Sequence, residues 1–293
     1  MLKGQIISNI SNLYQVELEN KILECTPRGK MKQSEISPVV GDYVEIEVLE
    51  NENNKGVICN ILDRTMYNKR PKMSNLTQII LVVSLKSPKP DYLLLDKQLA
   101  YAEYLNIKPI ICINKIDLGK EEQIKEIHEV YEKIGYTVID TNAKEMLGIS
   151  KLKSLLNNEI TAFSGNSGVG KSTLINSLFG ENKTEEGLIS KKNQRGKNTT
   201  TSVTLYKVED GYIADTPGFS TFSIEEIESR DLSKYFIEFS EYLNECEYAD
   251  CEHEKEENCG IKRALKEGKV NIGRYERYCK IKAELKEKEE HKW

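Results

Sequence analysis

A phosphate-binding loop is the strongest chemical signal in this chain of 293 residues. Residues 165–172 read Gly-Asn-Ser-Gly-Val-Gly-Lys-Ser, which matches the pattern G-x-x-x-x-G-K-[ST]. In such a loop the backbone N–H groups surround the α- and β-phosphates of a nucleotide. Lys171 can reach the β- and γ-phosphates, and Ser172 can hold Mg²⁺. We therefore expect a nucleotide to contact Gly165, Asn166, Ser167, Gly168, Val169, Gly170, Lys171, Ser172 and Thr173.

The segments on either side of this loop have the pattern that it requires. An apolar run over residues 160–163 predicts a strand that leads into the loop. The apolar spacing over residues 173–179 predicts a helix that leads out, and Gly180 can end that helix. The alternative is a Gly-rich turn before an ordinary helix, and the strand–loop–helix context makes that the weaker interpretation.

A second motif predicts that the base is guanine. Asn114-Lys115-Ile116-Asp117 has the pattern N-K-x-D and follows an apolar, strand-like run over residues 109–113. The Asp117 carboxylate can accept hydrogen bonds from guanine N1–H and N2, whereas adenine would leave it unpaired. Asn114 can tie this loop to the phosphate loop, and the stem of Lys115 can cover the base. The alternative is a strand-to-helix turn, but the carboxyl end of a strand is where α/β sheets bind ligands.

Three further segments can complete a GTP site. The backbone N–H of Ala143 can meet guanine O6, although the match around it is loose. Residues 199–201 are all threonine in a basic, polar stretch, and Thr200 is our choice for a Mg²⁺ ligand; a flexible polar loop is the alternative. Residues 215–218 read Asp-Thr-Pro-Gly, where Asp215 can hold Mg²⁺ through water and the Gly218 N–H can meet the γ-phosphate.

The order of these motifs is rotated along the chain. The guanine motif precedes the phosphate loop, whereas ordinary GTPases have the phosphate loop first, so the chain resembles circularly permuted GTPases. Phe219 stands where Ras-like GTPases carry a glutamine that orients water. We therefore expect slow intrinsic hydrolysis, with the missing group supplied by another part of the chain, a cation or a partner.

A cluster of cysteines near the C-terminus has metal-ligand spacing. The pattern C-x4-C-x-H-x5-C offers Cys246, Cys251, His253 and Cys259, which is the Cys₃His set of a structural Zn²⁺ site. All four ligand positions are filled, which argues against a catalytic zinc. The alternative is three incidental cysteines and a surface histidine. The chain has seven cysteines in all, and an odd number argues against a disulfide framework.

The apolar pattern predicts three domains. Short alternating runs over 5–7, 13–18, 21–25, 43–48 and 56–61 predict a five-stranded barrel, for which an OB-fold is our first choice, in domain 1–66. Its basic loop over 26–37 can touch RNA or can be a solvated loop.

Domain 67–222 should be the α/β GTPase domain. Expected strands there are 78–83, 109–113, 136–139, 160–163, 203–208 and 211–214, and expected helices are 91–106, 120–134, 149–156 and 173–179.

Domain 223–293 should be helical around the zinc site. We expect a helix over 231–243 and one or two basic helices over 261–292. Residues 262–292 carry eleven Lys and Arg against six Asp and Glu, although the whole chain has a net charge of −5. Tyr275 and Tyr278 alternate with Arg274 and Arg277, which predicts either an RNA-binding surface or a solvated, charged helix.

Composition places the chain among soluble globular proteins. Hydrophobic residues make up 39% and charged residues 30% of the chain, and we find no apolar run of the 18 residues that a membrane span needs. The N-terminal residues lead into a strand-like stretch and not into a signal-peptide core. We therefore expect a cytoplasmic protein that acts without a membrane.

The combined order of barrel, N-K-x-D, phosphate loop, threonines, D-T-P-G and Cys₃His motif resembles one family over nearly the full chain, the ribosome small-subunit-dependent GTPase A family. The resemblance implies an OB-fold, a permuted GTPase domain and a zinc-binding domain. It also implies a monomeric factor that uses GTP/GDP and Mg²⁺, carries one structural Zn²⁺, and binds the small (30S) ribosomal subunit and its rRNA during late maturation. GTP hydrolysis would then be stimulated by that subunit. A non-catalytic, GTP-sensing RNA or protein adaptor is the alternative, and an adenine-specific ATPase is a weaker one.

Overall fold

The computed structural model describes residues 1–19, 21–29, 37–49, 54–180, 203–215 and 224–291. The chain forms two compact units, which are described separately below. Unit 1 contains Met1–Ile80, Ala143–Ser164 and Lys171–Ser220, and unit 2 contains Leu81–Asn142, Gly165–Gly170 and Thr221–Trp293. Thr200, Gly218 and Phe219 lie outside the described residues, as do Thr199 and Thr201.

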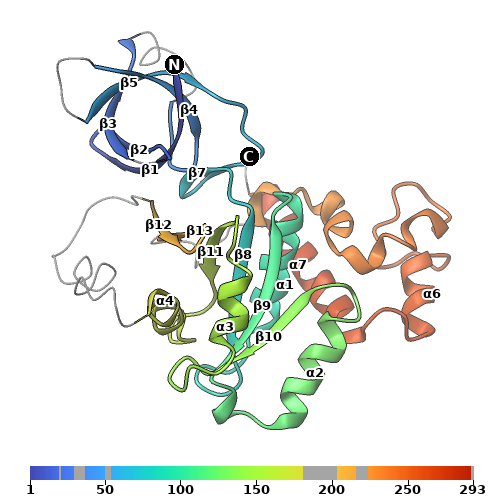
Figure 1. Cartoon of the computed structure of the whole chain (residues 1–293). Coiled ribbons are helices and arrows are strands. Elements are labelled where there is room, and N and C mark those ends of the chain that lie inside the picture. Colours follow the sequence, from blue (N-terminus) through green and yellow to red (C-terminus); the bar gives the residue numbers. More distant parts are fainter. Residues whose placement is uncertain (20, 30–36, 50–53, 181–202, 216–223, 292–293) are drawn as a thin grey trace. The chain divides into compact units, whose positions relative to one another are not determined.

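Unit 1 begins with a closed five-stranded barrel (Figure 1). Its strands are β1 (Leu2–Ile10), β2 (Leu13–Glu17), β3 (Ile22–Pro27), β4 (Tyr43–Val48) and β5 (Lys55–Ile61). All pairs are antiparallel except β3–β5, and β1 closes the barrel by pairing with both β2 and β4. Alternate side chains point inward, and the fully buried ones are Ile6, Val16, Leu23, Cys25, Val44, Ile46 and Ile58. The predicted five-stranded barrel is therefore confirmed.

A buried carboxylate joins the barrel to a hairpin that the sequence analysis did not predict. The hairpin consists of β6 (Tyr67–Lys69) and β7 (Lys72–Ser74). The fully buried Asp42, just before β4, accepts hydrogen bonds from the Ser74 hydroxyl (2.6 Å), the Val39 N–H (2.8 Å) and the Arg64 guanidinium (2.7 and 2.8 Å). These donors give the buried carboxylate the hydrogen-bond partners that a buried polar group requires.

The rest of unit 1 contains a second group of strands with two helices. The strands are β11 (Ile160–Ser164), β12 (Thr204–Val208) and β13 (Gly211–Asp215), and the helices are α3 (Ile149–Ser154) and α4 (Lys171–Phe179). Strand β13 is parallel to β11 and antiparallel to β12. Strand β1 of the barrel pairs with β12 at Ser8 and Thr204. Strand β8 (Gln78–Ser84) contributes residues to both units, and all seven of its residues are buried, as its continuous apolar run predicts.

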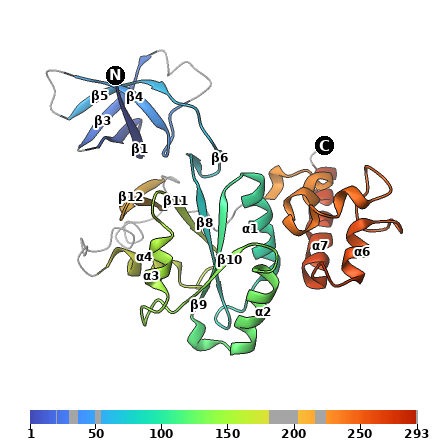
Figure 2. The ribbon, with the colours of Figure 1, turned by 45° about the vertical axis from the view of Figure 1, so that its right-hand side comes forward.

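Unit 2 contains parallel strands, helices and the C-terminal segment (Figure 2). Strands β9 (Lys108–Asn114) and β10 (Thr137–Thr141) are parallel. They accompany helices α1 (Tyr92–Tyr104) and α2 (Glu121–Tyr131) and the 3₁₀ turn η2 (Ile116–Leu118). The C-terminal segment contains η5 (Ile224–Glu226), η6 (Ser229–Tyr235), η7 (Ile237–Phe239), η8 (Leu243–Glu245), α6 (Gly260–Lys266) and α7 (Ile272–Glu290). Among the described helices, none has both the length and the apolar character that a membrane span requires.

The predicted helix over residues 231–243 is wrong. The chain forms the short 3₁₀ turns η6 and η7 here, and Phe236 between them is extended, with φ −100° and ψ 92°. This interruption allows Phe236 and Phe239 both to be fully buried against the ring of Tyr278, at centroid distances of 5.3 and 5.1 Å. Aromatic burial therefore prevails over local helical spacing in this segment.

Both interpretations of the Arg and Tyr residues on α7 are wrong for Arg274 and Tyr278, whereas Tyr275 and Arg277 are partly exposed. Arg274 is 1% exposed and Tyr278 is fully buried, so neither belongs to an RNA-binding surface or to a solvated face. Arg274 and Arg277 bind acidic side chains of α1 and η7, as described below. Tyr275 and Tyr278 donate hydrogen bonds to the carbonyls of His253 (2.7 Å) and Glu252 (3.1 Å). The interior of unit 2 thus takes up charges that the sequence pattern assigned to the surface.

Candidate functional site

The phosphate loop has the backbone conformation that its glycines permit. Gly165, Gly168 and Gly170 have φ values of +136°, +81° and +101°, a region that residues with a side chain rarely adopt. A Cβ atom at Gly165 would lie 2.2 Å from the carbonyl oxygen of Val82, and one at Gly170 would lie 2.3 Å from Nδ2 of Asn114. Both glycines therefore allow a close approach as well as a turn. The loop leads into α4, which begins at Lys171.

Asn114 links the N-K-x-D segment to the phosphate loop. Its side chain is almost fully buried at the end of β9, where Nδ2 donates to the carbonyl oxygen of Val169 (2.9 Å). Its Oδ1 accepts a hydrogen bond from the Thr141 hydroxyl (3.2 Å), which fixes the orientation of the amide. This is the link between the two loops that the sequence predicts.

Lys115 adds a second link to the same loop. It has a left-handed backbone (φ +60°), and its ammonium group donates to the carbonyls of Ser87 and Gly168, both at 2.6 Å. Asp117 lies two residues further on, in η2, with an exposed side chain, and Ile116 is partly exposed. The N-K-x-D segment therefore anchors the loop through Asn114 and Lys115 and leaves the Asp117 carboxylate accessible to a base.

The remaining predicted nucleotide contacts lie in unit 1. Lys171, Ser172 and Thr173 form the first turn of α4, where the helix dipole favours an anion. Partial burial lowers the pKa of Lys171, and a bound phosphate would have the opposite effect. The Ala143 carbonyl accepts a hydrogen bond from Ser177 of α4 (3.2 Å), and Asp215 is the last residue of β13.

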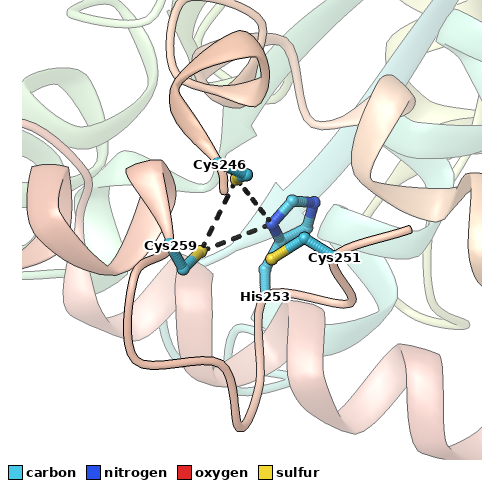
Figure 3. Close-up of side chains that lie close together, drawn as sticks. All are labelled: Cys246, Cys251, His253 and Cys259. Carbon is cyan, nitrogen blue, oxygen red and sulfur yellow. Dashed lines mark hydrogen bonds between the residues drawn. The ribbon is translucent and has the colours of Figure 1, made fainter. Parts of the chain in front are cut away.

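The four predicted zinc ligands lie together in unit 2 (Figure 3). Nδ1 of His253 lies 3.5 Å from Sγ of Cys246 and 3.4 Å from Sγ of Cys259, and these two sulfur atoms are 3.9 Å apart. With Cys251 included, all four ligand atoms lie within 4.8 Å of one another. Zn–S and Zn–N bonds of about 2.3 and 2.0 Å give tetrahedron edges of about 3.5 to 3.8 Å, so the observed distances fit one zinc ion.

Electrostatics also favours a cation in this cluster. Burial raises the pKa of Cys251 to about 12, and the neighbouring Cys259 adds to this effect. Three thiolates in contact would repel one another without a cation, and a coordinated metal ion deprotonates such thiols. Burial lowers the pKa of His253, which favours the neutral imidazole that metals bind.

Sequence reasoning missed the residues that hold the zinc-ligand loop in place. The Glu256 carboxylate accepts hydrogen bonds from the backbone N–H groups of Glu252 (2.8 Å), Glu254 (3.0 Å) and Lys255 (3.1 Å). Burial alone would raise the pKa of Glu256, but these backbone hydrogen bonds lower it to about 2. Lys282 of α7 donates to the carbonyl of Glu252 (2.8 Å). In the sequence Glu256 is one of several neighbouring acidic residues, so no local signal distinguished it.

Comparisons with known proteins agree over the whole chain. The model of the RsgA GTPase family matches residues 59–225, and that of the RsgA N-terminal domain matches residues 3–58. The "Small ribosomal subunit biogenesis GTPase RsgA" of Clostridium botulinum (strain Eklund 17B / Type B) is 43% identical over 293 residues, which is 100% of both chains. The protein of the same name from Alkaliphilus metalliredigens (strain QYMF) is 40% identical over 98% of both chains.

Two solved structures are similar to this fold. The crystal structure of YjeQ from Thermotoga maritima superposes with a TM-score of 0.85 at 36% identity and covers 97% of this chain and 98% of that one. The structure of YloQ, described as a circularly permuted GTPase, gives a TM-score of 0.84 at 32% identity, with coverage of 98% and 96%. These similarities match the rotated motif order, the barrel and the helical C-terminal segment described above.

Proposed function

This chain belongs to the RsgA family of small ribosomal subunit biogenesis GTPases, and on that premise we propose that it assists late maturation of the 30S subunit with subunit-stimulated GTP turnover. As a member of this family it is a hydrolase that acts on GTP. The observation that carries the proposal is the hydrogen bond from Asn114 to Val169, because it holds the guanine motif against the phosphate loop.

In this proposal each motif has one role in binding GTP. Asp117 accepts hydrogen bonds from the guanine N1–H and N2 groups, and the Ala143 N–H donates to O6. The backbone from Gly165 to Thr173, with the Lys171 ammonium, surrounds the phosphates. The stem of Lys115 covers the base face, and Ile116 spaces Lys115 and Asp117 in the same turn.

Two further roles concern the γ-phosphate end of the nucleotide. Ser172, Thr200 and Asp215 would hold Mg²⁺, which offsets the charge on the β- and γ-phosphate oxygens when it is bound. The Gly218 N–H would bind the γ-phosphate. Phe219 cannot orient water, so the proposal requires the small subunit, a cation or another part of the chain to supply that group.

In this proposal the regions on either side of the GTPase domain bind rRNA and Zn²⁺. We assign residues 1–66 to an rRNA-binding barrel, 67–222 to the GTPase domain and 223–293 to the zinc-binding domain of a monomeric, cytoplasmic protein. Zn²⁺ bound by Cys246, Cys251, His253 and Cys259 would be structural, because the four side chains fill all of its tetrahedral positions. The distances and the burial of the cluster support this assignment.

Asp117→Asn is the sharpest test of the guanine site. An amide offers a donor where guanine also has a donor, so GTP affinity should fall while xanthine nucleotides, with an acceptor at C2, should bind better. Titration of the wild type and the variant with fluorescent GDP and XDP measures this change in base preference. A variant that still prefers guanine over xanthine and adenine nucleotides would refute the assigned role of Asp117.

Turnover assays test the ribosomal partner. Hydrolysis of GTP should rise with purified small subunits and not with large subunits, and ATP should remain a poor substrate. Lys171→Ala should abolish the stimulated rate. Equal turnover by the wild type and Lys171→Ala under all conditions would instead favour a non-catalytic, GTP-sensing adaptor.

A further inference from the structure

Helix α1 carries two carboxylates that contact different parts of unit 2. Asp91 is its N-cap residue, and Asp96 lies just over one turn further along. Asp91 contacts the phosphate loop, whereas Asp96 contacts α7 of the C-terminal segment. None of the nucleotide motifs contains either residue, and the sequence analysis assigned no function to them.

Asp91 uses its two carboxylate oxygens for two different tasks. Oδ1 accepts a hydrogen bond from the Leu94 N–H (3.0 Å) and so caps α1. Oδ2 accepts a hydrogen bond from Nδ2 of Asn166 in the phosphate loop (3.3 Å). The loop is thus held at Asn166 by Asp91, at Gly168 by Lys115 and at Val169 by Asn114. Of these three, only Asp91 belongs to a long helix, so it makes the loop position depend on α1.

Asp96 is part of a largely buried ionic cluster, in which Asp96 and Arg274 are at most 1% exposed and Arg277 is 18% exposed. Its carboxylate accepts hydrogen bonds from Arg274 (2.5 Å), from Nε of Arg277 and from the Tyr131 hydroxyl (2.9 Å). Arg274 also donates to both carboxylate oxygens of Glu238 (2.5 and 3.0 Å). Two guanidinium groups thus balance two carboxylates. Such a cluster has a fixed geometry, because any displacement leaves a buried charge without its partner.

The two contacts are close enough for α1 to transmit a displacement. Five residues separate Asp91 from Asp96, which is roughly 7.5 Å along the axis of a regular helix. Helix α1 and helix α7 pack side by side over this region (Figure 1). A shift of α7 that moves Asp96 would therefore move the hydrogen-bond acceptor of Asn166 at the start of the same helix.

We propose that Asp91 is a positioning residue for the phosphate loop, and that α1 makes nucleotide affinity depend on the contact between Asp96 and α7. This inference rests on the proposed nucleotide site. It gives the C-terminal segment an influence on the phosphate loop through described residues of unit 2, without passing through residues 216–223.

A double-mutant cycle tests the contact between Asp91 and Asn166. Asp91→Ser retains a helix cap but is too short to reach Asn166, and Asn166→Ala removes the other partner and leaves the cap intact. Each should weaken binding of fluorescent mant-GDP by about three- to tenfold, the usual net size of one hydrogen bond, because the contact is long and exposed. The double variant should lose no more than either single variant. Wild-type affinity in both single variants, or fully multiplicative losses in the double variant, would overturn the role of Asp91.

A second comparison tests the influence of α7. Arg277→Ala removes a partner of Asp96, whereas Arg263→Ala, on α6, removes a partner of Glu245 in η8. Release of mant-GDP should be at least threefold faster in Arg277→Ala and unchanged in Arg263→Ala, and Arg277→Lys should recover part of the difference. Equal release rates in all three variants would overturn the coupling.

Binding of mant-GDP to the wild type distinguishes a failure of this inference from a failure of the proposed function. If the full chain fails to bind mant-GDP, the proposed nucleotide site is wrong and this inference is wrong with it. If the wild type binds and the variants bind equally well, only this inference is wrong. Zinc content and the circular dichroism spectrum, measured on each variant, identify any variant whose loss of binding reflects unfolding.

Discussion

Replacing Arg274 by methionine should cost a large part of the stability of unit 2. The Arg274 side chain is 1% exposed, and it is the cation that binds Glu238, itself 5% exposed. Burial lowers the pKa of Arg274, but Asp96 and Glu238 raise it well above its ordinary value, so the side chain stays charged. Removing one partner of a buried ion pair costs about 3–5 kcal/mol, because the other charge remains buried. Methionine fills much of the same volume, so little of this loss should come from a cavity.

Urea denaturation at fixed nucleotide and zinc concentrations measures the loss from the shift of the midpoint at constant m value. Lys125→Met is the control, because Lys125 is 74% exposed and pairs with Glu129 on the surface of α2 at 3.6 Å, so this variant should lose under about 1 kcal/mol. Arg274→Met combined with Glu238→Leu should recover at least half of the loss, since it removes both charges. The reasoning is refuted if Arg274→Met loses no more stability than Lys125→Met.

Three other predictions follow from single contacts. Gly170→Ala should weaken mant-GDP binding at least tenfold, because a Cβ atom would lie 2.3 Å from Nδ2 of Asn114 at a φ of +101°; wild-type affinity would contradict this. Partial burial lowers the pKa of His128, but hydrogen bonding to Asp140 (2.9 Å) raises it overall. The wild type should therefore be more stable than His128→Gln below about pH 6.5, by under about 1 kcal/mol, and lose that advantage as the pH rises through the raised pKa; urea midpoints that differ equally at pH 6 and pH 9 would exclude it. Cys259→Ser should reduce bound zinc from about one ion per chain toward none and lower the melting temperature, and metal analysis that finds unchanged zinc would show that Cys259 is not a ligand.

The sequence predicted those elements whose cause is local. The apolar run of β8 is buried on every side, as a parallel strand requires, and its pattern was sufficient to identify it. The glycines of the motif likewise predict the positive φ values at Gly165 and Gly170, because only glycine adopts them readily. The close spacing of the Cys₃His residues is sufficient to predict the zinc cluster from the sequence alone.

The sequence did not predict contacts between residues far apart in the chain. Arg274 sits in a run of basic residues that suggests a solvated or RNA-binding helix, and its burial depends on Asp96, 178 positions earlier. Phe236 interrupts a segment with helical spacing because its ring packs on Tyr278 and Arg274. The sequence around Asp91 also does not predict its hydrogen bond from Asn166. An aspartate at this position indicates a helix N-cap, which is common and does not identify a second partner.

The pairing of Asp96 with Arg274 has a consequence for the synthesis of the chain. A ribosome adds about 5–20 residues per second, so roughly 10 to 35 s pass between the addition of these two residues. During that interval α1 can form, but its central carboxylate lacks both guanidinium partners. The interior of unit 2 can therefore close only after α7 has been synthesised and has left the ribosome. The barrel, whose strands all lie within the first 61 residues, is free of this delay.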